Sequence, residues 1–277
     1  MHAVSADGSN IFAEAIGNPS NPAVVFIHGF SGSGLVFEKQ FSDTTLQTNL
    51  YQIRYDMRGH GRSDQPTSAD SYTSQLFAED FKAVCEAFNV EKPFLAGWSF
   101  GGTIGADICA NLGPEYLSGE ILLSSVPYGA AFPQVGKGDI VPVLQTLGSP
   151  TTTSADYAKA ASDFVDSFVA PGLAIPVETK WLWMGAVLAQ KPAVRSLLRS
   201  RTQDPAALIT SRLPLLVIQG KNDVHLNAEK SKDLIKETFG SIAEYHTFEG
   251  VGHMPFYERA DETNRLILEF VTRCKSA

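Results

Sequence analysis

Short, continuously apolar segments recur along the chain, and segments with a helical pattern separate most of them. Such segments are typical of strands that are buried on both faces of a sheet. They lie at 23–29, 51–57, 93–99, 119–126 and 213–220, and a more polar strand is expected at 243–250. This alternation predicts an α/β fold with a mostly parallel central sheet and helices on both faces. The residues up to Gly17 can add antiparallel strands at one edge.

The stretch from 127 to about 210 interrupts the alternation. It contains no strong strand, but helix-like patterns occur at 154–169 and 181–190. A structureless loop of this length is implausible in a compact domain. We therefore predict a helical cap at 127–210, inserted into an α/β core that consists of 1–126 and 211–277.

Composition excludes several classes of partner. The formal net charge is -8, and no run of basic residues occurs, which argues against nucleic acids and anionic membranes as partners. No apolar run approaches the length of a transmembrane helix, and the first residues lack a signal-peptide pattern, so we expect a cytoplasmic protein. Three cysteines without a C-x-x-C pair indicate neither a disulfide framework nor a zinc site. We expect no metal or cofactor, and the sequence leaves the oligomeric state open.

The segment Gly97-Trp98-Ser99-Phe100-Gly101 matches the pattern G-x-S-x-G. It follows a predicted strand and begins a predicted helix, which is the context that makes this short pattern informative. A sharp turn there places serine in a strained backbone conformation, and the flanking glycines avoid collisions between side chains. The pattern predicts that Ser99 is a nucleophile for an ester-like carbonyl.

A serine hydroxyl needs a general base, and the base needs a carboxylate to orient it. His253 lies in a glycine-rich loop after the last strand, and Asp223 follows the strand at 213–220. Loops after parallel strands gather at the same sheet edge as Ser99. We therefore predict His253 as the base and Asp223 as its partner. His28 and His60 also lie near strand ends. For both we expect a structural role, in which the ring forms hydrogen bonds to loop backbone, rather than the role of catalytic base.

The order Ser99, Asp223, His253 and two further motifs resemble the α/β-hydrolase fold superfamily, in its capped serine esterase-like branch. His28-Gly29-Phe30 is similar to the oxyanion loop of that family, and 56–63 is similar to its D-x-R-G-x-G-x-S loop. The resemblance implies that the backbone N–H groups of Phe30 and Phe100 form the oxyanion hole.

Aromatic residues in and near the predicted cap suggest an apolar substrate pocket. We expect Trp98, Trp181, Trp183 and Met184 to contribute to it, and the substrate to be a small apolar carboxylic ester that is cleaved through an acyl-enzyme. A serine nucleophile argues against the related haloalkane dehalogenases and epoxide hydrolases, which use a carboxylate.

Several alternatives on the same scaffold stay open. These are an acyltransferase with an alcohol acceptor, a lactone or carbon–carbon bond hydrolase, and a ligand receptor. The carbon–carbon bond hydrolases usually show an H-G-x-G-P-G loop, and the proline is missing from the run that starts at His28.

Overall fold

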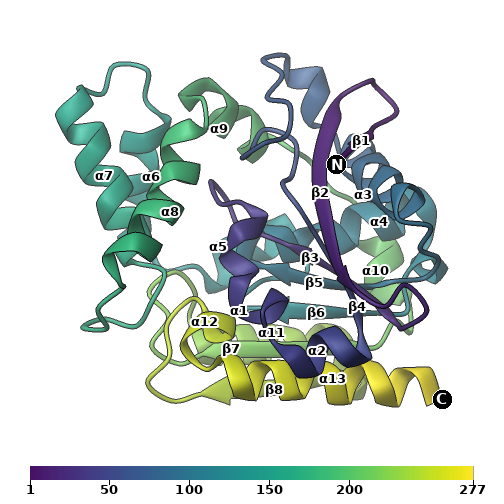
Figure 1. Ribbon diagram of the computed structural model, residues 1–277. Helices are drawn as coiled ribbons and strands as arrows, with labels where there is room; N and C mark the ends of the chain where they lie inside the picture. Colours follow the sequence, from purple (N-terminus) through teal and green to yellow (C-terminus); the bar gives the residue numbers. More distant parts are fainter. Residues whose placement is uncertain (277) are drawn as a thin grey trace.

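The computed structural model describes residues 1–276. Its central sheet has the strand order β1-β2-β4-β3-β5-β6-β7-β8 (Figure 1). The strands are β1 (His2–Val4), β2 (Asn10–Gly17), β3 (Ala23–Ile27), β4 (Tyr51–Tyr55), β5 (Phe94–Trp98), β6 (Gly119–Leu123), β7 (Leu215–Gly220) and β8 (Ala243–Phe248). Pairing is parallel from β4 through β8, whereas β1 and β2 are antiparallel edge strands, as the sequence predicts.

Helices cover both faces of the sheet. One face packs against α3 (Ser74–Ala87), α4 (Ile104–Leu112) and α11 (Ala228–Phe239). The other face packs against α1 (Glu38–Phe41), α2 (Thr44–Asn49) and α13 (Ala260–Ser276). The central strands β4, β5, β6 and β7 are buried along their whole length. Strands β5, β6 and β7 are accordingly mostly apolar, whereas β4 alternates, with Gln52 and Arg54 buried between apolar residues.

Six helices lie between β6 and β7, where the sequence predicts a helical insertion. They are α5 (Phe132–Val135), α6 (Val141–Gly148), α7 (Ser154–Asp166), α8 (Val177–Ala189), α9 (Pro192–Arg199) and α10 (Ala206–Thr210). Helices α6 to α9 gather at one end of the sheet, at the left in Figure 1, whereas α10 contacts α4 of the core. We call α5 to α9 the inserted helices.

Short elements complete the fold. Helix α12 (Pro255–Glu258) follows β8, and a 3₁₀ helix, η3 (Ser99–Thr103), joins β5 directly to α4. Further 3₁₀ turns are η1 (Gly34–Phe37), η2 (Ala69–Tyr72), η4 (Pro114–Tyr116), η5 (Gly129–Ala131), η6 (Gly138–Ile140) and η7 (Gly240–Ile242). No helix among residues 1–276 has both the length and the apolar character to cross a bilayer.

Candidate functional site

Ser99 lies at the sharp turn where β5 becomes η3. Its φ is 52°, in the left-handed region that residues with a side chain seldom adopt. A Cβ atom on Gly101 would collide with the carbonyls of Ile27 and His28, and one on Gly97 would collide with the backbone of Gly102. Glycine at these positions therefore lets the turn close and holds the Ser99 side chain at the end of the strand.

His253 and Asp223 meet at the same end of the sheet, in the loops after β8 and β7. His253 Nδ1 lies 2.8 Å from Asp223 Oδ2, and both side chains are almost fully buried. His253 Nε2 is also buried and has no hydrogen-bond partner among the described residues. Ser99 and His253 line one cavity, so the free ring nitrogen and the hydroxyl belong to the same site.

The Asp223 carboxylate is held by several donors. Oδ1 accepts from the backbone N–H of His225 at 2.7 Å and of Leu226 at 3.1 Å, and Oδ2 accepts from Gln219 Nε2 at 2.7 Å. Burial by itself raises the pKa of Asp223, but the charge and hydrogen bond of His253, together with His225, outweigh burial and lower the net pKa. The carboxylate is therefore ionised and fixed in orientation.

Two contacts hold the loop that carries His253. Trp98 Nε1 donates to the His253 carbonyl at 2.9 Å, which ties the residue before Ser99 to this loop. The Glu258 carboxylate accepts from Gly252 N at 2.9 Å and from Ala170 N at 3.1 Å. Glu258 thus joins the His253 loop to the segment that follows α7.

His225 is a site residue that the sequence analysis did not identify. Its ring stacks on that of His253, with 4.0 Å between centroids and an interplanar angle of 11°, and it lines the cavity. Its Nε2 lies 2.8 Å from Ser167 Oγ, at the end of α7. A histidine only two residues after Asp223 is poorly placed in the sequence to bridge to Ser99, and no sequence pattern signals a stack of two rings.

The backbone N–H of Phe30 has no acceptor among the described residues, and that of Phe100 lies in the first turn of η3, where N–H groups have no intrahelical acceptor. Both residues line the cavity. His28 holds the loop that precedes Phe30. Its Nε2 accepts from Met57 N at 3.0 Å, and its Nδ1 donates to the Gly29 carbonyl at 2.7 Å. This is the structural role that the sequence indicates for His28.

The cavity above Ser99 has a volume of about 510 Å³. Most of its wall is apolar, and the inserted helices and their flanks supply much of that wall. Their apolar lining residues are Phe132, Ile140, Val141, Leu144, Phe164, Phe168 and Leu198.

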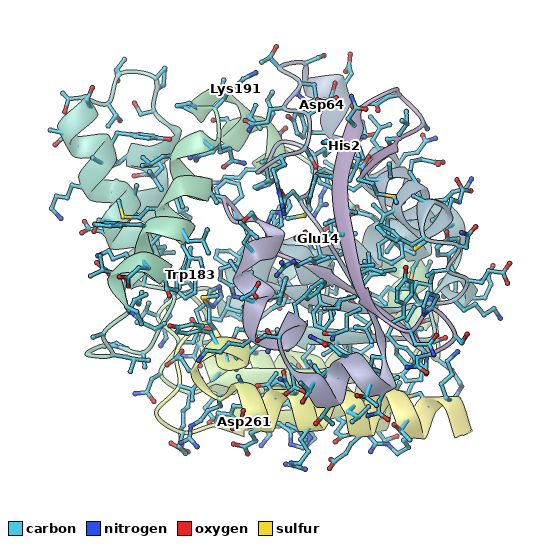
Figure 2. All side chains as sticks on the ribbon, in the orientation of Figure 1. His2, Glu14, Asp64, Trp183, Lys191 and Asp261 are labelled. Atoms are coloured by element: carbon cyan, nitrogen blue, oxygen red, sulfur yellow. The ribbon has the colours of Figure 1, made fainter. Side chains whose placement is uncertain are left out.

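Of the four residues expected to line the pocket, only Trp98 is among the lining residues. Trp183, labelled in Figure 2, is buried. Its ring packs against that of Tyr257 in α12, at 4.8 Å between centroids. Met184 is partly buried in the same cluster, and Trp181 is 68% exposed. Helical spacing alone cannot tell which face of α8 meets a pocket, and Trp181, Trp183 and Met184 are not among the residues that line the cavity.

One side of the cavity is polar, which the sequence analysis also missed. Arg201 lines it, pairs with Asp107 at 2.7 Å and lies 4.6 Å from the centroid of the Phe100 ring. Gln203 spans from Gly129 N to the Thr103 carbonyl, at 2.7 Å each. These partners are far apart in the sequence, so no local motif signals them. Within residues 1–276, no group of three His, Cys, Asp or Glu side chains is placed to hold a metal ion.

The sheet order, the turn at Ser99 and the inserted helices define an α/β-hydrolase fold. A family model described as the alpha/beta hydrolase family matches residues 24–266, and the chain belongs to that family.

Two curated relatives and one solved structure, at 25–26% identity, cover nearly the whole chain. The chain is 26% identical over 271 residues to the AB hydrolase superfamily protein YisY of Bacillus subtilis, with 94% of each chain covered. It is 26% identical to the bifunctional esterase/perhydrolase DCH of Acinetobacter calcoaceticus, over 98% of this chain and 99% of that protein. Among solved structures, the esterase RhEst1 from Rhodococcus sp. ECU1013 is similar with a TM-score of 0.86 and 25% identity, covering 98% of both chains. Together they indicate a hydrolase.

Proposed function

We propose that this protein is a carboxylesterase-type serine hydrolase in which Ser99, His253 and Asp223 form a catalytic triad. The observation that carries the proposal is the buried His253–Asp223 pair, whose free Nε2 shares a cavity with the strained Ser99. In this arrangement Nδ1 donates to the carboxylate, so Nε2 is the nitrogen that can take a proton.

The first half of the reaction forms an acyl-enzyme. His253 Nε2 takes the Ser99 proton as Oγ attacks the carbonyl carbon of the ester. The negative charge that develops on the carbonyl oxygen is stabilised by the backbone N–H groups of Phe30 and Phe100, which are free to donate. The intermediate then collapses, the bond to the alcohol oxygen breaks, and His253 returns the proton to that leaving oxygen.

The second half releases the acid. Water attacks the acyl carbon and gives a proton to His253, and the proton passes to Ser99 Oγ as its bond to the acyl carbon breaks. The apolar wall of the cavity favours small uncharged esters, with apolar groups against Phe164, Phe168 and Leu144. The inserted helices act as a cap in this proposal, because they supply that wall.

A panel of p-nitrophenyl esters with increasing acyl length tests the proposal. Ser99→Ala should lower turnover by about 10⁴–10⁶-fold, and a fluorophosphonate should label the wild type but not this variant. Ser68→Ala, at an exposed loop serine, is the matched control and should retain full activity. Turnover that persists in Ser99→Ala would overturn the assignment of the nucleophile.

A second candidate function is acyl transfer to an acceptor other than water. It is supported by the apolar cavity and by the name of the Acinetobacter relative, a bifunctional esterase/perhydrolase. Product analysis in aqueous methanol distinguishes the two, because an acyltransferase forms methyl ester as the main product whereas a hydrolase forms mainly the acid.

A further inference from the structure

The ring of His225 has a contact that defines which of its nitrogens carries the proton. Ser167 Oγ donates its single hydrogen to the Phe164 carbonyl at 2.6 Å, so it can only accept from His225 Nε2 at 2.8 Å. A neutral imidazole carries one N–H. His225 Nδ1 is therefore the unprotonated nitrogen, which accepts hydrogen bonds and cannot donate them.

No described residue donates to His225 Nδ1, although the ring lines the cavity and stacks on His253. Burial, together with the neighbouring His253, lowers the pKa of His225 to about 3. The ring therefore stays neutral while His253 gains and loses a proton beside it. The result is a permanent hydrogen-bond acceptor next to the general base.

The contacts between His225 and Asp223 do not explain why the side chain at position 225 is an imidazole. The bond to Asp223 Oδ1 comes from the backbone N–H of His225, which any residue except proline would supply. A phenylalanine ring at this position would stack on His253 equally well. An imidazole with an unsatisfied nitrogen costs desolvation energy that an apolar ring does not.

We infer that His225 Nδ1 accepts a hydrogen bond from the water molecule that attacks the acyl group on Ser99. The inference rests on the proposed acyl-enzyme function and assigns His225 to its second half. One hydrogen of the water is directed at His253 Nε2 and the other at His225 Nδ1, which orients the oxygen lone pair for attack.

The step is balanced without a further reactant. The water oxygen bonds to the acyl carbon as one proton passes to His253 Nε2, and the second hydrogen stays on the oxygen, held by His225. The bond between the acyl carbon and Ser99 Oγ then breaks, and Oγ takes the proton from His253. The acid leaves with the hydrogen that His225 oriented.

Methanol provides a sharp test, because it has one hydroxyl hydrogen where water has two. That hydrogen must go to His253, so methanol cannot use His225 as an acceptor. His225→Phe keeps an aromatic ring against His253 and removes the acceptor. It should slow hydrolysis of the acyl-enzyme but leave methanolysis nearly unchanged.

The experiment uses p-nitrophenyl acetate in buffer with methanol. Release of p-nitrophenol in the burst phase reports acylation, and the ratio of methyl acetate to acetate reports the fate of the acyl group. In His225→Phe the burst rate should stay within about threefold, the acetyl-enzyme should accumulate in intact-mass spectra, and the product ratio should rise roughly tenfold or more. Because the product ratio is internal to each sample, it does not depend on the folded fraction.

Ser167→Ala is the second variant and retains the His225 ring. Without Ser167 Oγ the Nε2–H of His225 loses its side-chain acceptor and the tautomer is held less firmly, so the product ratio should rise in the same direction by a smaller factor. An unchanged ratio in both variants, or equal loss of both products, would overturn the inference. Failure of the proposed function has a different signature, since the wild type would then form no acetyl-enzyme that depends on Ser99.

Discussion

Arg195 Nε in α9 donates to Ser31 Oγ over 3.2 Å and joins the inserted helices to the loop after β3. The same guanidinium donates to Tyr157 Oη at 2.8 Å and to the carbonyls of Leu147 and Val187. Arg195 is almost fully buried, and its hydrogen-bond partners among the described residues are all uncharged. The charge is therefore stabilised by oriented dipoles rather than by a carboxylate.

Ser31 directly follows Phe30, so the contact from Arg195 also restrains the backbone of the site at Phe30. Its φ is 56°, and its hydroxyl donates to Gln190 Oε1 at 2.5 Å. Gln190 Nε2 in turn donates to the Gly59 carbonyl at 2.7 Å. The backbone that presents the Phe30 N–H is thus held from the inserted side as well as from the core.

Arg195→Ala should destabilise the fold by about 2–4 kcal/mol, because it leaves buried acceptors without a donor. Thermal unfolding followed by circular dichroism measures this loss. Arg199→Ala removes an exposed arginine from the same helix and should change stability by less than about 0.5 kcal/mol. Equal effects of the two substitutions would contradict a structural role for the buried guanidinium.

Asp223→Asn tests the orientation of His253. The amide keeps the shape of the carboxylate but cannot stabilise the charged imidazole, and it favours the wrong tautomer. We expect kcat to fall by roughly 10⁴-fold, with a much smaller change in KM. Steady-state kinetics on a p-nitrophenyl ester provides the measurement, and Asp70→Asn, at an exposed position, is the control. Retention of more than about a tenth of the activity would argue against the triad.

Glu120 in β6 should make stability depend on pH. It is fully buried, neither oxygen has a hydrogen-bond partner among the described residues, and burial raises its pKa well above the ordinary value. The folded protein therefore keeps a proton that the unfolded chain loses near its ordinary pKa of about 4.3. The contribution of Glu120 to the free energy of unfolding is therefore complete below that pH. It falls as pH rises towards the folded-state pKa, by up to about 1.4 kcal/mol per pH unit.

Glu120→Gln removes this titration and keeps a similar shape. Urea unfolding between pH 5 and pH 8 should show a smaller decline in unfolding free energy for the variant than for the wild type. Glu237→Gln, at an exposed position in α11, should leave the wild-type decline unchanged. Parallel curves for Glu120→Gln and wild type would show that Glu120 does not hold its proton in the folded state.

Trp181 and Trp183 form a matched pair on α8. Trp183→Ala should cost about 3–5 kcal/mol, because the ring is buried against Phe168 and Tyr257. Trp181→Ala should be nearly neutral for stability and for kcat/KM, because the side chain is exposed and outside the cavity lining. Thermal unfolding and an ester panel check both statements. A changed acyl-length preference in Trp181→Ala would show that Trp181 contacts the substrate and would contradict this prediction.

The sequence by itself determined the order and type of the core elements. Continuous apolar runs mark strands that are buried on both faces, and this signal is local to each strand. The glycine pattern around Ser99 is also local in sequence, although Gly101 is required by the distant carbonyls of Ile27 and His28 and only Gly97 by the turn itself. Asp223 and His253 could be placed at one sheet edge because parallel strands end on the same side.

Only the tertiary structure decided which side chains distant in sequence meet at the cavity and around it. His225 stacks on His253, Arg195 meets Ser31, and Arg201 meets Asp107, across separations of 28, 164 and 94 residues. Trp181 and Trp183 differ by two positions on one helix, yet one is exposed and the other buried. The physical reason is that packing between helices depends on their relative rotation and on contacts distant in sequence, which a periodic pattern does not contain.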